Sequence, residues 1–386
     1  MIFKKSREKK EKVPSPTLKE IRFMLYRIIQ SPLSIIGSVI IMFFAIVAVL
    51  APILAPPNPS WDIAGYEGKN PFILPRVSYV TEPQPPSLAH PFGLTPEGFD
   101  IYYGIVWGAI TAFRVGIYVV GLSLIIGVTV GLLAGYYGGI IDEILMRFTD
   151  IIIIFPGLVL AMAFALALPQ TLSITLREIL PIFAIISLIL TISLMISKGG
   201  LSWKWVIIEN ATIISVIASV LIYTGNIPNV DLISFSMTKL DKVLIALVLV
   251  GWPGYTRVIR GEVLRVRSED YIEAAKASGC SDFRIIGRHI LPNAVYPILI
   301  LASMDIGSIV LTAAALSFLR VGAEMDFADW GQLVEKSQTY MGTGSSLLRY
   351  WYIWVIPGAF IFLFSLGWNL LGDAIRDIMD PTLRRR

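Results

Sequence analysis

Residues 32–54 read PLSIIGSVIIMFFAIVAVLAPIL, a run of 23 residues without a charged side chain. As a helix the run would be about 35 Å long, which is enough to cross the roughly 30 Å hydrocarbon core of a bilayer. The chain has 386 residues, of which 55% are apolar and 16% are charged, whereas soluble domains carry about 25% charged residues. So little charge cannot cover the water-facing surface of a chain this long, which excludes most soluble enzymes and disordered proteins.

Further apolar runs are bounded by charged residues along the rest of the chain. They are residues 115–136, 151–168, 179–196, 211–223, 243–256, 295–318 and 350–372. The run 243–256 is closely flanked by Lys242 and Arg257, whose long side chains can reach the two membrane interfaces. The pattern predicts an all-α polytopic membrane protein with eight spans.

The basic residues predict the orientation of these spans. Nine Lys and Arg residues lie in the arm 1–31, and with this arm in the cytoplasm 23 of the 32 basic residues fall inside. An even number of spans then places both termini in the cytoplasm. Residues 17–30 suit either an interfacial helix or an extension of the first span. The net charge of +4 is explained by cytoplasmic Lys and Arg, so we expect no nucleic-acid partner.

The predicted domain organisation follows the same charges. After the cytoplasmic arm 1–31 and the first span 32–54 comes a proline-rich external loop, 55–113, which we expect to be extended and rich in turns. Spans two and three occupy 114–168, an insertion occupies 169–240, and the remaining spans occupy 241–386. The insertion holds either two spans or a pair of re-entrant or membrane-surface helices.

A second stretch, residues 269–293, reads EDYIEAAKASGCSDFRIIGRHILPN and lies in a predicted cytoplasmic loop, 257–292. Residues 271–278 are good helix formers, and Gly279 permits a left-handed turn. Ser281 or Asp282 can cap a second helix that runs to about residue 290, and Pro292 limits its extension. The sequence therefore predicts a helix–turn–helix along the membrane face.

The spacing E-A-A, three residues, Gly, eleven residues, L-P resembles the EAA loop of ABC importer permeases. In that family the loop docks on an ATPase subunit and transmits its closure to the membrane domain. The resemblance assigns this coupling role to six residues: Glu273, Ala274, Ala275, Gly279, Leu291 and Pro292. An ordinary juxtamembrane helical hairpin is the alternative.

Other stretches are similar to the dipeptide/oligopeptide/nickel branch of these permeases. They are HPFGLTPEGFD at 90–100, GLLAGYYGGIIDEILMRFTDIIIIFPGLVLA at 131–161, GWPGYTRVIRGEVL at 251–264, AALSFL at 314–319 and NLLGDAIRDIMDPTLR at 369–384. The cytoplasmic arm and the order of these motifs resemble the C-type permease of a pair. Phe99 stands where the family commonly has Arg, so a role for that position is not carried over. The implied fold is the type I permease fold, with six family spans plus the insertion.

The resemblance also implies partners. These are a second permease subunit in a heterodimer, two ABC ATPase subunits, an external solute-binding protein and the lipid bilayer of the cytoplasmic membrane. The chain has no G-x-x-x-x-G-K-[ST] motif, so ATP and Mg are expected on the ATPase subunits and no cofactor on this chain. With Cys280, His90 and His289 far from ligand spacing, we expect no metal site and no catalytic residue. Family members carry peptides, nickel or oligosaccharides; a secondary transporter or channel without an ATPase is the alternative function.

Asp305 is the one carboxylate deep in a predicted span. Charged groups inside the membrane face a cavity or a partner, because their burial in hydrocarbon is costly. Asp305 is therefore a candidate for the translocation path, and a hydrogen bond or ion pair to a neighbouring helix is the alternative. Gly127, Gly131 and Gly135 recur every four residues, which predicts a face for close helix packing.

Overall fold

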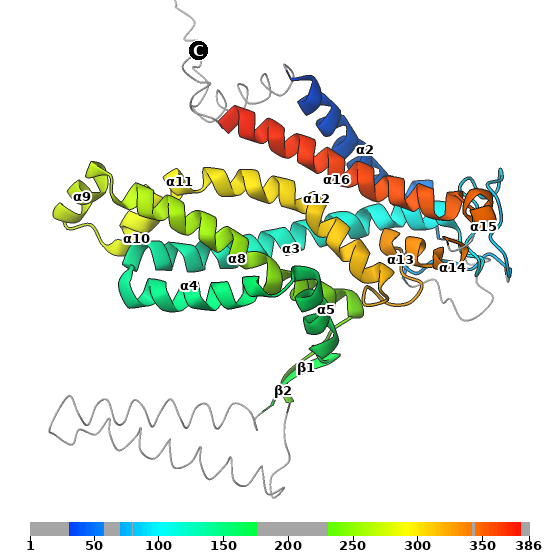
Figure 1. Cartoon of the computed structure of the whole chain (residues 1–386), viewed down its shortest axis with the longest axis horizontal. Coiled ribbons are helices and arrows are strands. Elements are labelled where there is room, and N and C mark those ends of the chain that lie inside the picture. The colour runs from blue at the N-terminus through cyan, green and yellow to red at the C-terminus, as the bar shows by residue number, and fades with distance from the viewer. Residues whose placement is uncertain (1–30, 58–69, 79, 176–230, 342–343, 380–386) are drawn as a thin grey trace, which may run out of the picture. The chain divides into compact units, whose positions relative to one another are not determined.

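The computed structural model describes residues 31–57, 70–78, 80–175, 231–341 and 344–379. Five helices in this part of the chain are long and apolar enough to cross a membrane (Figure 1). They are α2 (Pro32–Leu54), α3 (Ile101–Tyr137), α8 (Lys239–Arg267), α12 (Tyr296–Phe318) and α16 (Tyr352–Met379). The helices α4 (Gly139–Ile154) and α5 (Gly157–Ala167) form a bent pair that can count as a sixth span. The predicted helical, multi-pass fold is confirmed.

Helix α3 packs against α8 through the predicted glycine face. A Cβ atom at Gly127 would lie 2.6 Å from Tyr255 Cβ, and one at Gly135 would lie 2.8 Å from Val263 Cγ1. At Gly131 the distance to Ile259 Cγ2 would be 2.0 Å, and the Thr256 carbonyl oxygen would be 2.6 Å away. These contacts leave no room for a side chain, so the small residues are what lets the two helices approach.

Helix α3 begins at Ile101, well before the apolar run at 115–136. The side chain of Asp100 caps it by accepting a 3.1 Å hydrogen bond from the Tyr103 N–H, and His90 Nδ1 lies 2.7 Å from the other carboxylate oxygen. The expected external loop 55–113 therefore ends, as non-helical chain, at Asp100. The capping carboxylate and the burial of residues such as Ile105 and Trp107 account for the longer helix.

The third span is not the continuous helix expected at 151–168. It begins earlier, at Gly139, and breaks between α4 and α5 at Phe155 and Pro156, where the axis bends by 95°. Pro156 has no N–H to donate and disfavours helical backbone at the preceding residue. Phe155 accordingly has extended backbone, with φ −79° and ψ 141°.

Residues Ala167–Thr238 form a second compact unit, separate from the helical unit made by the rest of the chain. Its described part is an antiparallel pair of strands, β1 (Thr171–Thr175) and β2 (Asp231–Ser236), which pairs Thr171 with Ser236 and Leu172 with Phe235. The ladder is a local addition that the helical prediction for this insertion did not include. The two spans expected at 179–196 and 211–223 lie outside the described residues.

The core of the helical unit is aromatic where α2, α3, α16 and α13 (Trp330–Glu335) meet. The Phe44 ring lies 5.3 Å from that of Phe364 and 5.6 Å from that of Trp330. The Trp330 indole N–H donates a 3.0 Å bond to the Ile105 carbonyl, as buried indoles require. Two more short helices, α14 (Gln338–Met341) and α15 (Gly344–Arg349), precede α16.

Two non-glycine residues between α12 and α13 have left-handed backbone, namely Arg320 with φ 64° and Asp326 with φ 61°. Such a conformation costs a non-glycine residue on the order of 1–3 kcal/mol. Arg320 follows the end of α12, where its N–H bonds to the Ser317 carbonyl and the Val321 N–H bonds to the Leu316 carbonyl. This is the helix-ending motif whose left-handed position is usually glycine.

Candidate functional site

The residues of the EAA-like motif form a compact helical loop, residues 268–294, between α8 and α12. Helix α8 continues to Arg267, so the membrane helix extends into the loop expected at 257–292. Helix α9 (Asp270–Ala277) ends where the Cys280 N–H bonds to the Ala275 carbonyl and the Gly279 N–H bonds to the Lys276 carbonyl. Gly279 takes the left-handed position with φ 76°. The predicted turn at Gly279 is confirmed.

The second half of the loop is not one α-helix. It runs through α10 (Asp282–Ile285), a π-helical turn η2 (Ile286–Ile290) and α11 (Leu291–Ala294). In this wide turn the Leu291 N–H donates a hydrogen bond to the Ile286 carbonyl, five residues earlier. Pro292, which has no N–H, stands in the first turn of α11, where none is needed. The expectation that Pro292 limits the helix is wrong: the helical path continues through α11, because the π turn resets the hydrogen bonding before the proline.

The inner side of the helical loop is fixed to the membrane helices. Ile272, Ile285 and Ile290 are all fully buried in a cluster with Ile259 and Val263 of α8. Burying such side chains contributes about 1.5–3 kcal/mol each. The loop is therefore attached to α8 through packed, buried side chains.

A polar contact ties the same loop to α3. The Tyr136 hydroxyl donates a 2.5 Å hydrogen bond to Asp282 Oδ1, and the Lys276 ammonium lies 5.7 Å from the centre of the Tyr136 ring. Both halves of the loop thus contact the end of α3. The sequence did not single out Tyr136 or Asp282 as a pair, because residues so far apart are joined only by the fold.

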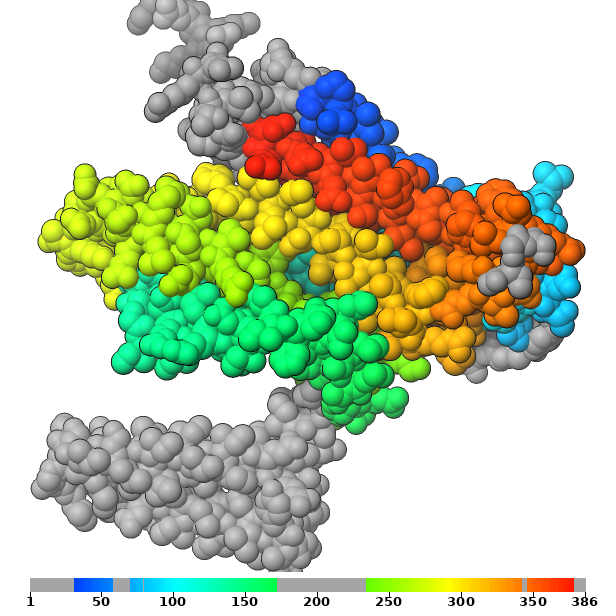
Figure 2. All heavy atoms as spheres, viewed as in Figure 1, coloured from blue at the N-terminus to red at the C-terminus, as the bar shows by residue number. Residues whose placement is uncertain are grey.

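The outer side of the helical loop is uncovered. Glu273 and Ala274 are exposed, whereas Ala275 is half-buried beneath them. Phe283 is 89% exposed and Tyr271 is 42% exposed. Helices α9 and α10, which carry these residues, lie in the yellow-green segment at one end of the molecule's helices (Figure 2). Two exposed aromatic rings beside small residues are typical of a surface that receives another protein.

Asp305 lies in α12, half-buried, and Oδ2 of its carboxylate accepts a 2.7 Å hydrogen bond from the Tyr255 hydroxyl of α8. Ion pairs join α8 to α4 as well: Arg260 holds both carboxylate oxygens of Asp142 at 2.6 Å, and Arg257 lies 2.6 Å from Asp150. The expected alternative for Asp305, a hydrogen bond to a neighbouring helix, is thus present.

Among the residues that the structure describes, no group of three or more His, Cys, Asp and Glu side chains is placed to hold a metal ion. His90 is engaged with Asp100, and His289 stands in the π turn. Cys280, within the helical loop, is half-buried and packs against the cluster that contains Ile272 and Ile285.

Comparison with known protein families decides what kind of protein carries this loop. Residues 127–385 match the family described as binding-protein-dependent transport system inner membrane component. The chain belongs to this family. Residues 22–72 match the N-terminal transmembrane domain of oligopeptide transport permease C, which agrees with the C-type order of motifs in the sequence. The permease subunit of an ABC importer is thus the function class of this chain.

The chain is similar to named transport permeases over almost its whole length. It is 30% identical to the dipeptide transport system permease protein DppC of Alkalihalophilus pseudofirmus, over 92% of this chain and 88% of the relative. It is 29% identical to a probable D,D-dipeptide transport system permease protein of Escherichia coli, over 91% and 88% of the two chains. The oligopeptide transport system permease protein OppC of Bacillus subtilis is 26% identical over 97% and 94%.

Proposed function

We propose that this chain is the C-type permease of a peptide importer whose solute movement is driven by partner ATPase subunits through the helical loop. Peptides are the proposed solutes because the relatives named above are dipeptide and oligopeptide permeases. ATP and Mg would be bound by two ATPase subunits. A second permease and an external solute-binding protein would complete the importer. This chain would be a multi-pass protein of the inner membrane, with both termini in the cytoplasm.

The observation that carries this proposal is the two-sided character of the helical loop. Its inner side is packed on α8 through Ile272, Ile285 and Ile290, and its outer side presents Glu273, Ala274 and the ring of Phe283. A partner that changes shape against the outer side would therefore displace α8 and α12 together. Differential contact of this kind is what a ligand-driven conformational change requires.

The six motif residues take different parts in this mechanism. Glu273, Ala274 and Ala275 would form the contact with the ATPase, and Gly279 would hold the turn that orients it. Leu291 and Pro292 would carry the displacement into α12, because they follow the π turn and precede that helix directly.

Phe283 provides the sharpest test. Its ring is 89% exposed, so Phe283→Ala should leave the folding of the chain unchanged while removing an apolar contact with the ATPase. We expect co-purification of the ATPase subunits and solute-stimulated ATP hydrolysis to fall about tenfold. Leu348→Ala, which removes a side chain that is 79% exposed in α15, is the matched control. ATPase association that is unchanged in the Phe283 variant would contradict the docking role.

A further inference from the structure

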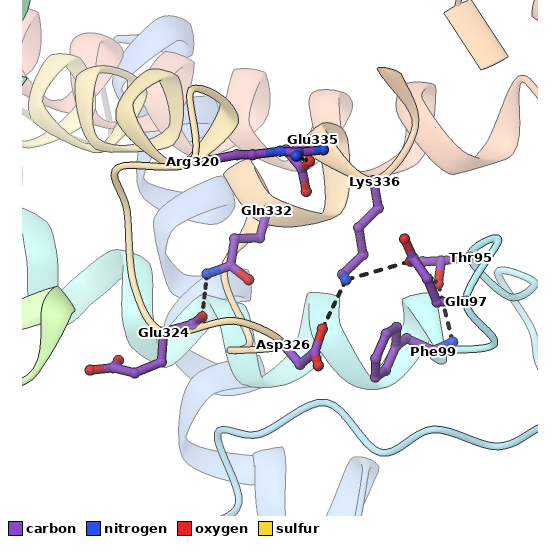
Figure 3. A network of polar contacts seen from close by, with 9 residues as sticks. All are labelled: Thr95, Glu97, Phe99, Arg320, Glu324, Asp326, Gln332, Glu335 and Lys336. Carbon is purple, nitrogen blue, oxygen red and sulfur yellow. Dashed lines mark hydrogen bonds and ion pairs between the residues drawn. The ribbon is translucent and has the colours of Figure 1, made fainter. Parts of the chain in front are cut away.

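A polar pocket lies at the end of α12 opposite the helical loop. It has a volume of about 280 Å³, and its walls come from the turn before α3, the 319–329 segment and α13. The lining includes Glu97, Arg320, Met325, Asp326, Glu335 and Lys336. Figure 3 shows these polar side chains, with Lys336 lying between the two acidic residues that it contacts.

Part of the pocket lining consists of charged side chains that are paired with one another. The Lys336 side chain is only 9% exposed, and its Nζ lies 2.9 Å from Asp326 Oδ1 and 3.5 Å from Glu97 Oε2. The same ammonium lies 4.4 Å from the centre of the Phe99 ring. Lys336 therefore joins the turn before α3 to the segment after α12, and its charge is neutralised within the chain.

Arg320, at the rim of the pocket, is much more exposed than Lys336 and makes fewer contacts within the chain. Its side chain is 78% exposed, and Nε donates a 2.6 Å hydrogen bond to Glu335 Oε1. Among the described residues, the guanidinium makes this one hydrogen bond. The N–H donors on both Nη atoms therefore remain available to a ligand. Its backbone is left-handed with φ 64°, in the position that Gly279 fills at the end of α9.

The stability of the fold does not account for an arginine here. A left-handed backbone costs more for arginine than for glycine, and an ion pair this exposed returns little of that cost. A residue that is unfavourable for the backbone, and whose head group is presented to solvent, points to a use for the head group itself.

We propose that Arg320 at the rim of this pocket binds a surface carboxylate of the external solute-binding protein. Arginine binds a carboxylate through two parallel N–H donors, which a free pair of Nη atoms offers. The neighbouring Met325 is 82% exposed, and methionine and arginine are both enriched in protein interfaces. The pocket volume of about 280 Å³ lies at the lower limit of the roughly 300–1,000 Å³ typical of whole-ligand sites, and a single inserted side chain would fit into it. This inference rests on the proposed function.

The test compares Arg320→Gly with the wild-type chain in the complete importer, reconstituted in lipid nanodiscs with the solute-binding protein that sustains its uptake. Because glycine favours the left-handed backbone, the variant should melt at the same temperature or higher. The dissociation constant of the solute-binding protein should nevertheless rise about tenfold. Arg320→Lys, which keeps the charge and loses the planar fork, should give a smaller rise. Arg349→Gln, at another exposed arginine before α16, should leave the affinity unchanged.

Two results would overturn the inference while the proposed function stands. One is wild-type affinity for the solute-binding protein in Arg320→Gly. The other is a rise of the dissociation constant in Arg349→Gln as large as that in Arg320→Gly, which would mean that general electrostatic attraction, and not Arg320 itself, binds the partner. If the wild-type importer recruits neither ATPase subunits nor a solute-binding protein, the proposed function fails and the inference fails with it. A charge swap, Arg320→Glu with arginine at the partner's carboxylate, should restore the affinity.

Discussion

The hydroxyl of Tyr255 in α8 donates a 2.7 Å hydrogen bond to the Asp305 carboxylate in α12. Helix α8 leads into the helical loop and α12 leads out of it. The bond therefore joins the two membrane helices that a movement of the loop would displace. Since few groups inside a membrane can replace a lost partner, this contact is costly to break.

Tyr255→Phe should lower the stability of the permease. The change leaves the Asp305 carboxylate half-buried without its hydroxyl donor, which costs about 1–3 kcal/mol. We expect a lower melting temperature of the purified protein in detergent. Tyr118→Phe, at a tyrosine of α3 that is 57% exposed, is the matched control and should melt like the wild type. An equal melting temperature for both variants would show that the bond contributes nothing.

Asp305→Asn separates a role in the translocation path from a structural one. Asparagine keeps an oxygen that can accept from Tyr255 and removes the negative charge. If Asp305 meets the cationic amino group of a peptide, uptake should fall at least about tenfold while the melting temperature changes little. Unchanged uptake with normal assembly would remove the pathway role and leave the hydrogen bond to Tyr255 as its function.

Gly131→Ala should separate α3 from α8. The new Cβ would lie 2.0 Å from Ile259 Cγ2 and 2.6 Å from the Thr256 carbonyl oxygen, so the helices must move apart. We expect a loss of about 1–3 kcal/mol, seen as a lower melting temperature and poorer assembly. Gly121→Ala in the same helix, where a Cβ would have nothing within 4 Å, should be neutral or slightly stabilising. Equal effects of the two substitutions would contradict the packing argument.

Hydropathy predicted the membrane helices well and their ends less well. The first span, residues 32–54, has the bounds of α2, because the apolar run itself fills that helix. Helix α3 begins at Ile101, since a capping aspartate and buried tertiary contacts extend it into chain that looked like loop. Pro156 was the local signal for the bend at Phe155 and Pro156. The prediction of one continuous span followed the uninterrupted run of apolar residues instead, and so missed the break.

The helical loop was predicted as a motif, whereas its attachment was not. Gly279 and the short helix before it follow from local residue preferences. The burial of Ile272 and the contact of Tyr136 with Asp282 depend on which helices pack together, and this is not encoded in any local pattern. The same holds for Tyr255 and Asp305, where the carboxylate was expected to need a partner but the partner could not be named.

Gly279→Val should abolish uptake coupled to ATP hydrolysis while the chain still inserts into the membrane. A Cβ at Gly279 would have nothing within 4 Å, so the penalty is the left-handed backbone, about 1–2 kcal/mol and more for a β-branched residue. The turn would then relax and misplace α9. Gly279→Asn should keep most activity, because asparagine tolerates this backbone. Measuring uptake into proteoliposomes with both variants tests the point, and normal coupled uptake in the valine variant would refute the coupling role of the turn.

Asp329 should make the stability of the permease depend on pH. Its side chain caps α13 by accepting from the Gly331 N–H at 3.3 Å, and its Oδ2 atom is buried. Burial raises the pKa of the Asp329 carboxyl above its ordinary value, because the charged form is poorly solvated there. The folded chain therefore holds this proton at pH values where the unfolded chain, with a pKa of about 3.9, has lost it.

The sign follows from proton counting. Since the folded state binds more protons than the unfolded state in this window, the contribution of Asp329 to stability is greatest at low pH and falls as the pH rises from about 4 through the raised pKa. One proton gives a slope of at most about 1.4 kcal/mol per pH unit. Asp329→Asn keeps the cap and removes the titrating group, so its melting temperature should depend less steeply on pH than that of the wild type. Asp270→Asn, at an exposed aspartate of α9, should retain the wild-type slope. A slope that survives in the Asp329 variant would mean that another group carries it.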